Sequence, residues 1–420
     1  MFFRNLSARD TFVKLKRAVT LSAQAKNEII SLIFDVASDI IEEAEDRCLS
    51  GDLWETFLAL RIAEDDNPLG RAAELRPAPS GSIVTAVTPE LWSLQKVVSA
   101  ARDLVRSWAD FAALLCLENY VPSSPRKGGV AGSAHEAVRE LAKNFGRALA
   151  PDDMMSALLE FYTSQGSGFF SLHRAFTWSK ERALVPALDP DPQTFASIIG
   201  YEEQKAELMA NTELFIGGRA ANNVLLYGDS GTGKSSSVKA LLNEPEFIAR
   251  GLRMIEVRKD QLVDLPEILR LIGGRNYRFI LFLDDLSFEE FEVEYKYLKA
   301  LIEGGVERKP ENAVIYATSN RRNIIREVWK DRKTESDDVH GGDTMQEKLS
   351  LADRFGITIW YGVVDKERYL EMVRFFADEY GLSMPREELD RLAMRWEIGK
   401  CGFSGRTARQ FAQHLMAEMR

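Results

Sequence analysis

A glycine-rich stretch carries the most specific chemistry in the sequence. The residues GDSGTGKS, 228–235, match the pattern GxxxxGK[ST], and they lie between the apolar run NNVLLY and the helix-forming run SSVKALL. A loop in this setting curls its backbone N–H groups inward, where they bond phosphate oxygens next to a helix N-terminus. The alternative, an ordinary glycine-rich turn, is disfavoured by the full match and its flanks. The residues expected to contact phosphates are Gly228, Asp229, Ser230, Gly231, Thr232, Gly233, Lys234, Ser235 and Ser236.

Two of these residues have assigned roles in this hypothesis. Lys234 is expected to neutralise the β- and γ-phosphates, and the Ser235 hydroxyl to bind Mg²⁺. The run FILFLDD ends a second apolar segment in Asp284 and Asp285. We expect Asp284 to bind Mg²⁺ and Asp285 to polarise the attacking water. Taken alone, the pair is also compatible with an acidic turn.

Three later residues complete the candidate catalytic set. Asn320 ends the run AVIYATSN, where its amide would orient water against the γ-phosphate, although an Asn after a strand is usually a turn residue. Arg354, in ADRFGITIW, precedes a further strand, and Arg406, in GFSGR, lies near the C-terminus with Arg409 behind it. Either arginine alone would be an ordinary surface charge in most proteins.

The elements that must position these residues fall into two unlike halves. From about 22 to 180 the apolar residues recur three and four apart, which predicts helices, one of them starting at Thr88–Pro89. Beyond the proline-rich segment 185–194, short apolar runs at 222–228, 253–259, 279–285 and 313–320 alternate with helical stretches. This alternation predicts a parallel sheet covered by helices on both faces. We expect a helical domain over 1–184, a linker over 185–194 and an α/β domain from 195.

Composition limits the classes of protein. The chain has 420 residues, 45% of them hydrophobic, and three distant cysteines, which indicate neither a disulfide framework nor a zinc site. The N-terminus lacks the pattern of an export signal, and no run stays apolar for about 18 residues. We therefore expect a cytoplasmic protein that does not enter a membrane. Because the net charge is −10, we do not expect the chain to bind nucleic acid directly.

In this order and spacing, the motifs resemble the AAA+ ATPase module, over about 195–420. The resemblance implies ATP and Mg²⁺ as ligands, an α/β P-loop domain over 195–362 and a small helical lid over 363–420. It also implies that Asn320 is sensor 1, Arg354 an arginine finger and Arg406 or Arg409 sensor 2. The segment FASIIGYEEQK is similar to the part that packs on adenine, with Ile198, Ile199 and Gly200 as the contacts.

The match narrows to one bacterial family. The stretches IIGYEEQKAEL, FLDDLSFE, YATSNRRNII and EKLSLADRFGITIW resemble the AAA+ family catalogued as domain of unknown function 815, and HRAFTW, 173–178, extends the resemblance. The implied activity is hydrolysis of ATP to ADP and phosphate, which would drive remodelling or switching of a partner protein. Ring or spiral homo-oligomers would do this work, with the partner held by the helical N-terminal domain.

Two departures from the module leave alternatives open. Most AAA+ proteins carry a glutamate where this chain has Asp285, so hydrolysis is expected to be slow; the alternative is a scaffold that binds ATP with little hydrolysis. Glu289 and Glu290 are read as a solvated face. The region 257–279 lacks the aromatic-apolar-glycine step of protein-threading relatives. The polar segment 329–348, with His340 among acids, is interpreted as a loop near a subunit interface rather than a metal site.

Overall fold

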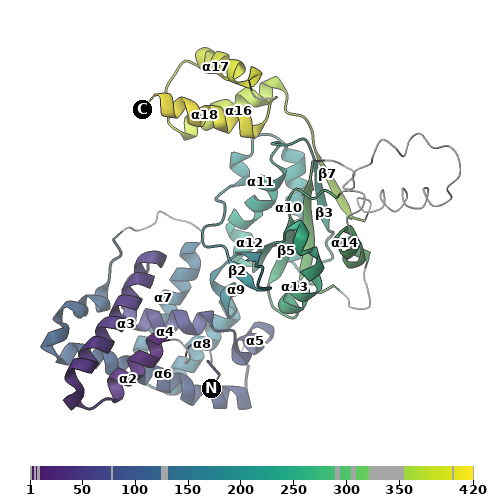
Figure 1. The fold of residues 1–420 in the computed structure, drawn as a ribbon. Helices are drawn as coiled ribbons and strands as arrows, with labels where there is room; N and C mark the ends of the chain where they lie inside the picture. Colours follow the sequence, from purple (N-terminus) through teal and green to yellow (C-terminus); the bar gives the residue numbers. More distant parts are fainter. Residues whose placement is uncertain are drawn as a thin grey trace. The chain divides into compact units, whose positions relative to one another are not determined.

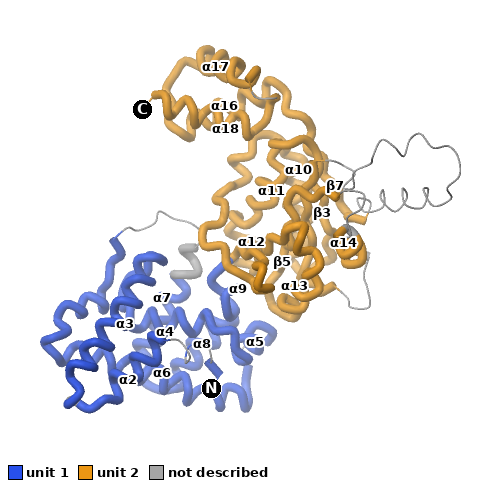
Figure 2. Tube along the Cα trace, in the orientation of Figure 1, with its two compact units in different colours: residues 1–173 blue, residues 174–420 orange. Residues whose placement is uncertain are grey.

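The computed structural model describes the backbone of residues 2–3, 6, 10–76, 79–123, 131–288, 294–303, 309–320, 354–399 and 402–419. It divides into two compact units, residues 1–173 and 174–420 (Figure 2). The division lies before the predicted boundary at 184. The reason is that Ala175–Trp178 and Leu184–Pro186 are strands, β1 and β2, that join the sheet of the second unit. Part of the predicted linker is therefore sheet.

The first unit is helical, as the apolar periodicity predicts. Its helices are α2 (Asp10–Thr20), α3 (Lys26–Arg47), α4 (Leu53–Glu64), α5 (Pro68–Leu75), α6 (Ser82–Ser107), α7 (Ala131–Arg147), α8 (Pro151–Gln165) and α9 (Phe169–Leu172), with 3-10 turns at Ala23–Ala25 and Ala109–Asn119. Helix α4 is buried on nearly every side, which is typical of the central helix of a bundle. Asp52 caps it by accepting from the backbone N–H groups of Trp54 and Glu55.

The predicted helix start at Thr88–Pro89 is wrong. Helix α6 begins at Ser82 and continues through Pro89. A proline inside a helix removes one backbone hydrogen bond and costs about 3 kcal/mol. Val87 and Leu91, on either side of it, are fully buried, and Thr88 Oγ1 donates to the Val84 carbonyl at 2.7 Å. Burial of the apolar face of α6 therefore outweighs the local signal for a helix start.

The second unit contains a seven-stranded sheet in the order β2-β1-β4-β5-β6-β3-β7 (Figure 1). The remaining strands are β3 (Val224–Gly228), β4 (Leu252–Glu256), β5 (Arg278–Leu283), β6 (Ala313–Ser319) and β7 (Ile357–Tyr361). All neighbours pair in parallel except β1 and β2, which are antiparallel. The predicted strands at 222–228, 253–259, 279–285 and 313–320 are confirmed. Because the strands are parallel, the loops that follow β3, β5 and β6 lie at the same edge of the sheet.

Helices cover the sheet because its central strands are apolar on both faces. Every residue of β6 is buried, and five of the six in β5. The helices between the strands are α10 (Glu202–Ile216), α11 (Lys234–Ala240), α12 (Pro245–Ala249), α13 (Leu265–Ile272) and α14 (Glu294–Glu303), with 3-10 turns at Phe195–Ser197, Leu241–Asn243 and Lys259–Asp264. Leu226, Ile280 and Tyr316 pack in one core with residues of α10 and α11.

Three helices follow the sheet and form the lid, seen in yellow in Figure 1: α16 (Lys366–Glu379), α17 (Arg386–Ile398) and α18 (Gly405–Glu418). Asp365 caps α16, and Ser404 caps α18 by accepting from the Thr407 backbone N–H. Phe376 of α16 and Phe411 of α18 lie in the same core as the sheet. Among the described helices, none combines the length and the apolar character that crossing a bilayer requires.

Candidate active site

The glycine-rich loop lies between the end of β3 and the start of α11, as the motif predicts. Gly228 has a φ of 140°, and a Cβ at this position would lie 2.0 Å from the Tyr361 carbonyl oxygen of β7. Gly233, with a φ of 96°, is the residue before the first turn of α11. Only glycine fits the first position, because the backbone of β7 occupies the space that any side chain would need.

Lys234 lies under this loop with 6% of its surface exposed. Its Nζ donates to the carbonyls of Gly228 and Asp229, at 2.8 and 2.6 Å, and to Asn320 Oδ1 at 3.2 Å. Burial lowers the pKa of the Lys234 ammonium; nearby Asp229, Asp285 and Asp284 oppose this effect, and Arg406 adds to it. The hydrogen-bond partners of this buried cation are neutral oxygens, so an anion in the pocket would stabilise it further.

One carboxylate oxygen of Asp284 accepts three hydrogen bonds. Its Oδ1 accepts from Ser235 Oγ at 2.5 Å, from Thr318 Oγ1 at 2.6 Å and from the Asp285 backbone N–H at 3.1 Å. Oxygens from the helix start and from the end of β5 therefore meet at one point. A hard cation such as Mg²⁺ takes one or two protein oxygens and fills its other positions with water and phosphate oxygens, so this donor set fits it.

Asp285 and Asn320 are held together beside Lys234. Asn320 Nδ2 donates to Asp285 Oδ1 at 2.7 Å, while Asn320 Oδ1 accepts from Lys234. A lysine only donates and an ionised carboxylate only accepts, so these partners fix the orientation of the amide. Asp285 itself has a φ of 51°, an uncommon left-handed conformation, and its N–H also donates to Thr318 Oγ1 at 2.9 Å.

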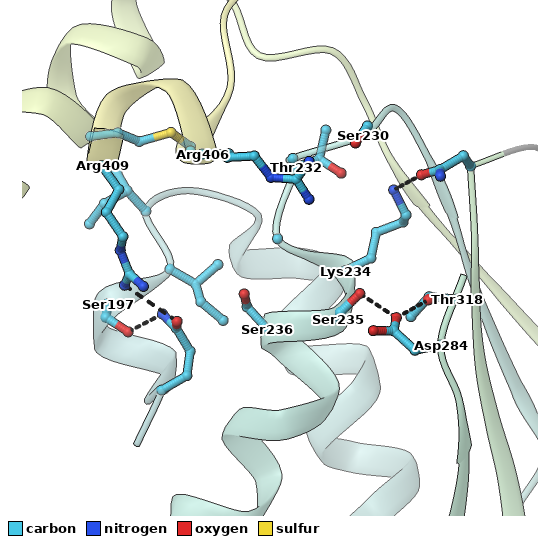
Figure 3. Close-up of a pocket in the computed structure, with 18 of the residues that line it drawn as sticks. Ser197, Ser230, Thr232, Lys234, Ser235, Ser236, Asp284, Thr318, Arg406 and Arg409 are labelled. Carbon is cyan, nitrogen blue, oxygen red and sulfur yellow. Dashed lines mark hydrogen bonds between the residues drawn. The ribbon is translucent and has the colours of Figure 1, made fainter. Parts of the chain in front are cut away.

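A cavity of about 440 Å³ extends from this cluster toward the lid. Its volume is in the range of small-molecule binding pockets. Figure 3 shows Ser197 and Arg409 at one side of it, and Lys234, Asp284 and Thr318 at the other. The lining residues outside the loop and the acidic cluster are Gln193, Ser197, Ile198, Ile199, Met372, Phe376, Gly405, Arg406 and Arg409.

The structure places many of the predicted site residues at the cavity and others away from it. Ser230 to Ser236, Asp284, Asp285, Asn320, Ile198, Ile199 and Arg406 all line the cavity. Gly228 and Asp229 contribute their carbonyls to Lys234 instead. Gly200, with a φ of 79°, packs against Arg368, where a Cβ would lie 2.7 Å from the guanidinium Nε. Glu289, Glu290, His340 and the segment 329–348 lie outside the described residues.

The two lid arginines lie at different ends of the cavity. The Gly405 N–H donates to the Gly231 carbonyl at 3.0 Å, which holds the start of α18 on the glycine-rich loop. The charge of Arg406 reaches Lys234, since it lowers the pKa of that ammonium. The Arg409 guanidinium instead lies 4.9 Å from the Phe376 ring centroid and 3.4 Å from Gln193 Oε1. Arg406 is therefore the lid arginine on the phosphate side.

Arg354 does not line the cavity of its own chain. It lies three residues before β7, which runs parallel to β3, whereas the glycine-rich loop follows the end of β3. Five strand residues, or roughly 16 Å of strand, separate these two ends of the sheet. Arg354 thus belongs to the opposite end from the phosphate loop.

Several lining residues were not predicted from the sequence. Thr318, Gln193, Ser197, Met372 and Phe376 carry no motif of their own. Thr318 lies near the end of the buried strand β6, two residues before Asn320, which follows the strand. Because side chains alternate along a strand, this spacing is the signal that places Thr318 on the same side as Asn320. The others reach the cavity through the packing of the lid and of segment 193–199, for which the sequence offers no comparable pattern.

The parallel sheet, the glycine-rich loop after β3, the acids after β5 and the amide after β6 define a protein of the AAA+ ATPase superfamily with a P-loop ATP-binding fold. The chain belongs to the family described as "Protein of unknown function (DUF815)", whose model matches residues 171–419. Both parts of the resemblance drawn from the sequence are thereby confirmed.

The curated relatives match this chain over only part of their own length. The ATP-dependent zinc metalloprotease FtsH of Aquifex aeolicus is 36% identical over 92 residues, 20% of this chain and 14% of that protein. FtsH 1 of Sphaerobacter thermophilus is 24% identical over 306 residues, 65% of this chain and 45% of that protein. In both cases the chain spans less than half of the relative.

Two solved structures have a backbone similar to part of this chain. The Thermotoga maritima RuvB Holliday junction branch migration motor has a TM-score of 0.38 at 17% identity, covering 54% of this chain and 65% of that one. The FIGL-1 AAA domain in complex with ADP has a TM-score of 0.37 at 14% identity, covering 55% and 75%. At such TM-scores neither structure bears on the residues of the cavity.

Proposed function

We propose that the chain binds ATP with Mg²⁺ in this cavity, hydrolyses the ATP to ADP and phosphate, and uses the cycle to remodel or switch a partner protein. The observation that carries the proposal is the hydrogen-bonded cluster of Lys234, Asn320 and Asp285 beside the Ser235–Asp284 pair. Cation, amide, carboxylate and metal-binding oxygens lie together at the mouth of a phosphate-binding loop. This is the set of groups that phosphoryl transfer to water requires.

Each group has a role in this proposal. Lys234 would exchange its loop carbonyls for the β- and γ-phosphate oxygens, which are better partners for a buried ammonium. Ser235 and Asp284 would hold Mg²⁺, which when bound offsets negative charge on the phosphate oxygens. Asn320 would orient the attacking water and Asp285 would accept its proton. Arg406, on the phosphate side of the lid, would sense the γ-phosphate.

A second candidate function rests on Asp285. Its side chain is one methylene shorter than the glutamate of most AAA+ proteins, and its carboxylate is already bound to Asn320 at 2.7 Å. A base held in this way needs a shift before it reaches a water molecule. The chain would then act as an interaction scaffold that binds ATP with little hydrolysis and reports the bound nucleotide to its partner.

Assembly and partner belong to the same proposal. The placement of Arg354 away from its own cavity supports a role in the cavity of a neighbouring copy, in a ring or a spiral. None of the lining residues that the structure describes belongs to the helical unit 1–173, so we assign partner binding to that unit.

Steady-state phosphate release by the purified protein tests the proposal and separates the two functions. We expect the wild type to release phosphate from ATP, and Asp285→Asn to bind ATP but release phosphate on the order of 100-fold more slowly, the scale set by losing a general base. Asp260→Asn, an exposed carboxylate paired with Arg258, is the matched control and should behave as wild type. Little or no phosphate release by the wild type, with ATP bound by both proteins, would favour the scaffold.

A further inference from the structure

Gln193 lies in the segment predicted as a linker, yet its side chain lines the cavity. Its backbone is fixed at both ends of the residue. The N–H donates to Asp191 Oδ1 at 3.2 Å, and the carbonyl accepts from Asn243 Nδ2 at 2.6 Å. Asn243 follows α11, so the loop that carries Gln193 is tied to the same helix that begins at the phosphate site.

The carboxamide of Gln193 is held in one orientation. Its Nε2 donates to Ser197 Oγ at 2.5 Å, and its Oε1 faces Arg409 Nη2 at 3.4 Å. Ser197 Oγ donates its single proton to the Thr194 carbonyl at 2.7 Å, so it can only accept a hydrogen bond from Gln193. An arginine only donates. A flipped amide would face a donor with its NH₂ group and lose both bonds.

Gln193 lies at the side of the cavity away from the phosphate loop. Its partners Ser197 and Arg409 are across the cavity from Lys234 and Asp284 in Figure 3. Apolar side chains of Ile198, Ile199, Met372 and Phe376 line the same cavity. A flat aromatic base would pack on such side chains and present its polar edge to an amide.

The fixed orientation of the Gln193 carboxamide would distinguish adenine from guanine. With its present partners satisfied, Gln193 keeps one lone pair on Oε1 and one proton on Nε2 for a ligand. Adenine carries an amino donor at position 6 next to a ring-nitrogen acceptor, which matches this pair, as in the Gln–adenine contacts of nucleic-acid recognition. Guanine carries an oxygen acceptor at position 6. If guanine bound in the same position as adenine, its oxygen at position 6 would face Gln193 Oε1, which is also an acceptor.

We propose that Gln193 reads the 6-amino group of the nucleotide base and thereby selects adenine over guanine, with Ser197 and Arg409 as positioning residues. The inference rests on the proposed binding of ATP at this site. It adds a base-reading side chain to a site in which the motifs account for the phosphates and the metal.

Equilibrium binding of base analogues tests this assignment without using hydrolysis. The ligands are ATP, GTP and purine riboside triphosphate, which has hydrogen in place of the 6-amino group. We expect the wild type to bind ATP about tenfold more tightly than purine riboside triphosphate, the effect of losing one hydrogen-bonded pair. Gln193→Ala should bind these two ligands equally. Gln413→Ala, an exposed lid glutamine, should keep the wild-type ratio.

Ser197→Ala supplies a second variant that keeps Gln193 in place. Without this acceptor the amide keeps only the longer contact with Arg409 and is held less firmly, so the ATP-to-GTP preference should fall while affinity for purine riboside triphosphate stays unchanged. If the wild type binds ATP but Gln193→Ala keeps the wild-type ratio, Gln193 does not read the base, and the proposed function stands. If the folded wild type binds none of the three ligands, the proposed function itself is wrong, and this inference with it.

Discussion

At the scale of single residues, the phosphate side of the cavity is organised by what each group can donate or accept. Asn320 joins a lysine to a carboxylate, and Asp284 Oδ1 receives two hydroxyls and a backbone N–H. These contacts bring residues of the glycine-rich loop, β5 and β6 to one place. The loop can adopt this position only because Gly228 lets β7 approach it.

Replacement of Gly228 by alanine tests that close approach. The left-handed φ of 140° adds strain of about 1–3 kcal/mol for a residue with a side chain, and the new Cβ would also meet the Tyr361 carbonyl at 2.0 Å. We expect Gly228→Ala to lower the thermal unfolding midpoint and to weaken ATP binding. Differential scanning calorimetry and a nucleotide titration measure the two effects.

Gly274→Ala is the matched control for this substitution. Gly274 has a φ of 74° with nothing within 4 Å of a Cβ, so it carries the strain without the clash. Its midpoint should fall less than that of Gly228→Ala, and its ATP affinity should be unchanged. Equal losses of stability in the two variants would contradict a role for the contact with β7.

At the scale of elements, buried tyrosines join the strands to the helices that cover them. Tyr361 of β7 donates to Ser237 Oγ of α11 at 2.8 Å, and Ser237 in turn donates to the Gly233 carbonyl at 2.9 Å. Tyr316 of β6 bonds to Asn211 and Thr212 of α10, each at 2.9 Å. The first chain of bonds links β7 directly to the phosphate loop.

These tyrosines make the stability of the second unit sensitive to alkaline pH. Burial raises the pKa of Tyr316 and of Tyr361 to about 12. An unfolded tyrosine titrates near 10, so the unfolded chain releases these protons first as the pH rises. The contribution of each tyrosine to the free energy of unfolding is therefore complete below about pH 10 and is lost as the pH rises through about 12.

Urea denaturation between about pH 9 and pH 12 measures this effect through its pH slope. Tyr361→Phe should be less stable than wild type at neutral pH, because Ser237 loses a partner, and its stability should fall less steeply above about pH 10. Tyr297→Phe, at a residue that is 46% exposed, should match the wild-type slope. An unchanged slope in Tyr361→Phe would show that burial of this hydroxyl does not drive the alkaline loss.

The sequence predicts the elements that carry motifs better than those that do not. The runs that became β3, β5 and β6 are apolar and end in glycine, acid or amide, so strand and site are visible together. Strands β1 and β2 pair at the edge of the sheet in a stretch with exposed residues and a proline, which has the composition of a linker. Pro89 gave a false helix start because local capping preference ignores burial of Val87 and Leu91.

Among the residues of the candidate site, too, the sequence predicts those that belong to motifs better than those that do not. Side chains suited to contact phosphate or metal are restricted in type, so Lys234 and Ser235 are recognisable from their motif, and Asp284 from its place after an apolar run in the ordered set of motifs. Gln193 and Phe376 reach the cavity from 193–199 and from the lid, more than 100 residues apart in sequence. Their convergence depends on tertiary packing, which a motif does not encode.

At the scale of the whole molecule, the proposed cycle needs more than one copy of the chain. Arg354 lies at the end of the sheet opposite to the phosphate loop of its own chain. An arginine supplied in trans to a transferring phosphoryl group is worth roughly 10³- to 10⁵-fold in rate. We therefore expect specific activity to rise with protein concentration.

Mixing two inactive variants tests the shared site. Arg354→Ala keeps a complete cavity and lacks the arginine, whereas Lys234→Ala keeps the arginine and lacks a working cavity. We expect each to be inactive alone and the mixture to regain part of the phosphate release, because some interfaces join an intact cavity to an intact Arg354. If Arg354 only supports the fold, the mixture stays inactive, Arg354→Ala unfolds earlier than wild type, and activity per molecule is constant on dilution.

The central claim, that this cavity binds ATP through its phosphates, is tested most directly by isothermal titration of ATP with Mg²⁺ into the wild type and Lys234→Ala. Lys234→Ala removes the buried ammonium and leaves the helical unit untouched, so circular dichroism should show both proteins folded. We expect saturable binding of about one ATP per chain to the wild type and no measurable binding to Lys234→Ala. Equal ATP affinity of the two proteins would contradict the assignment of the glycine-rich loop as the phosphate site.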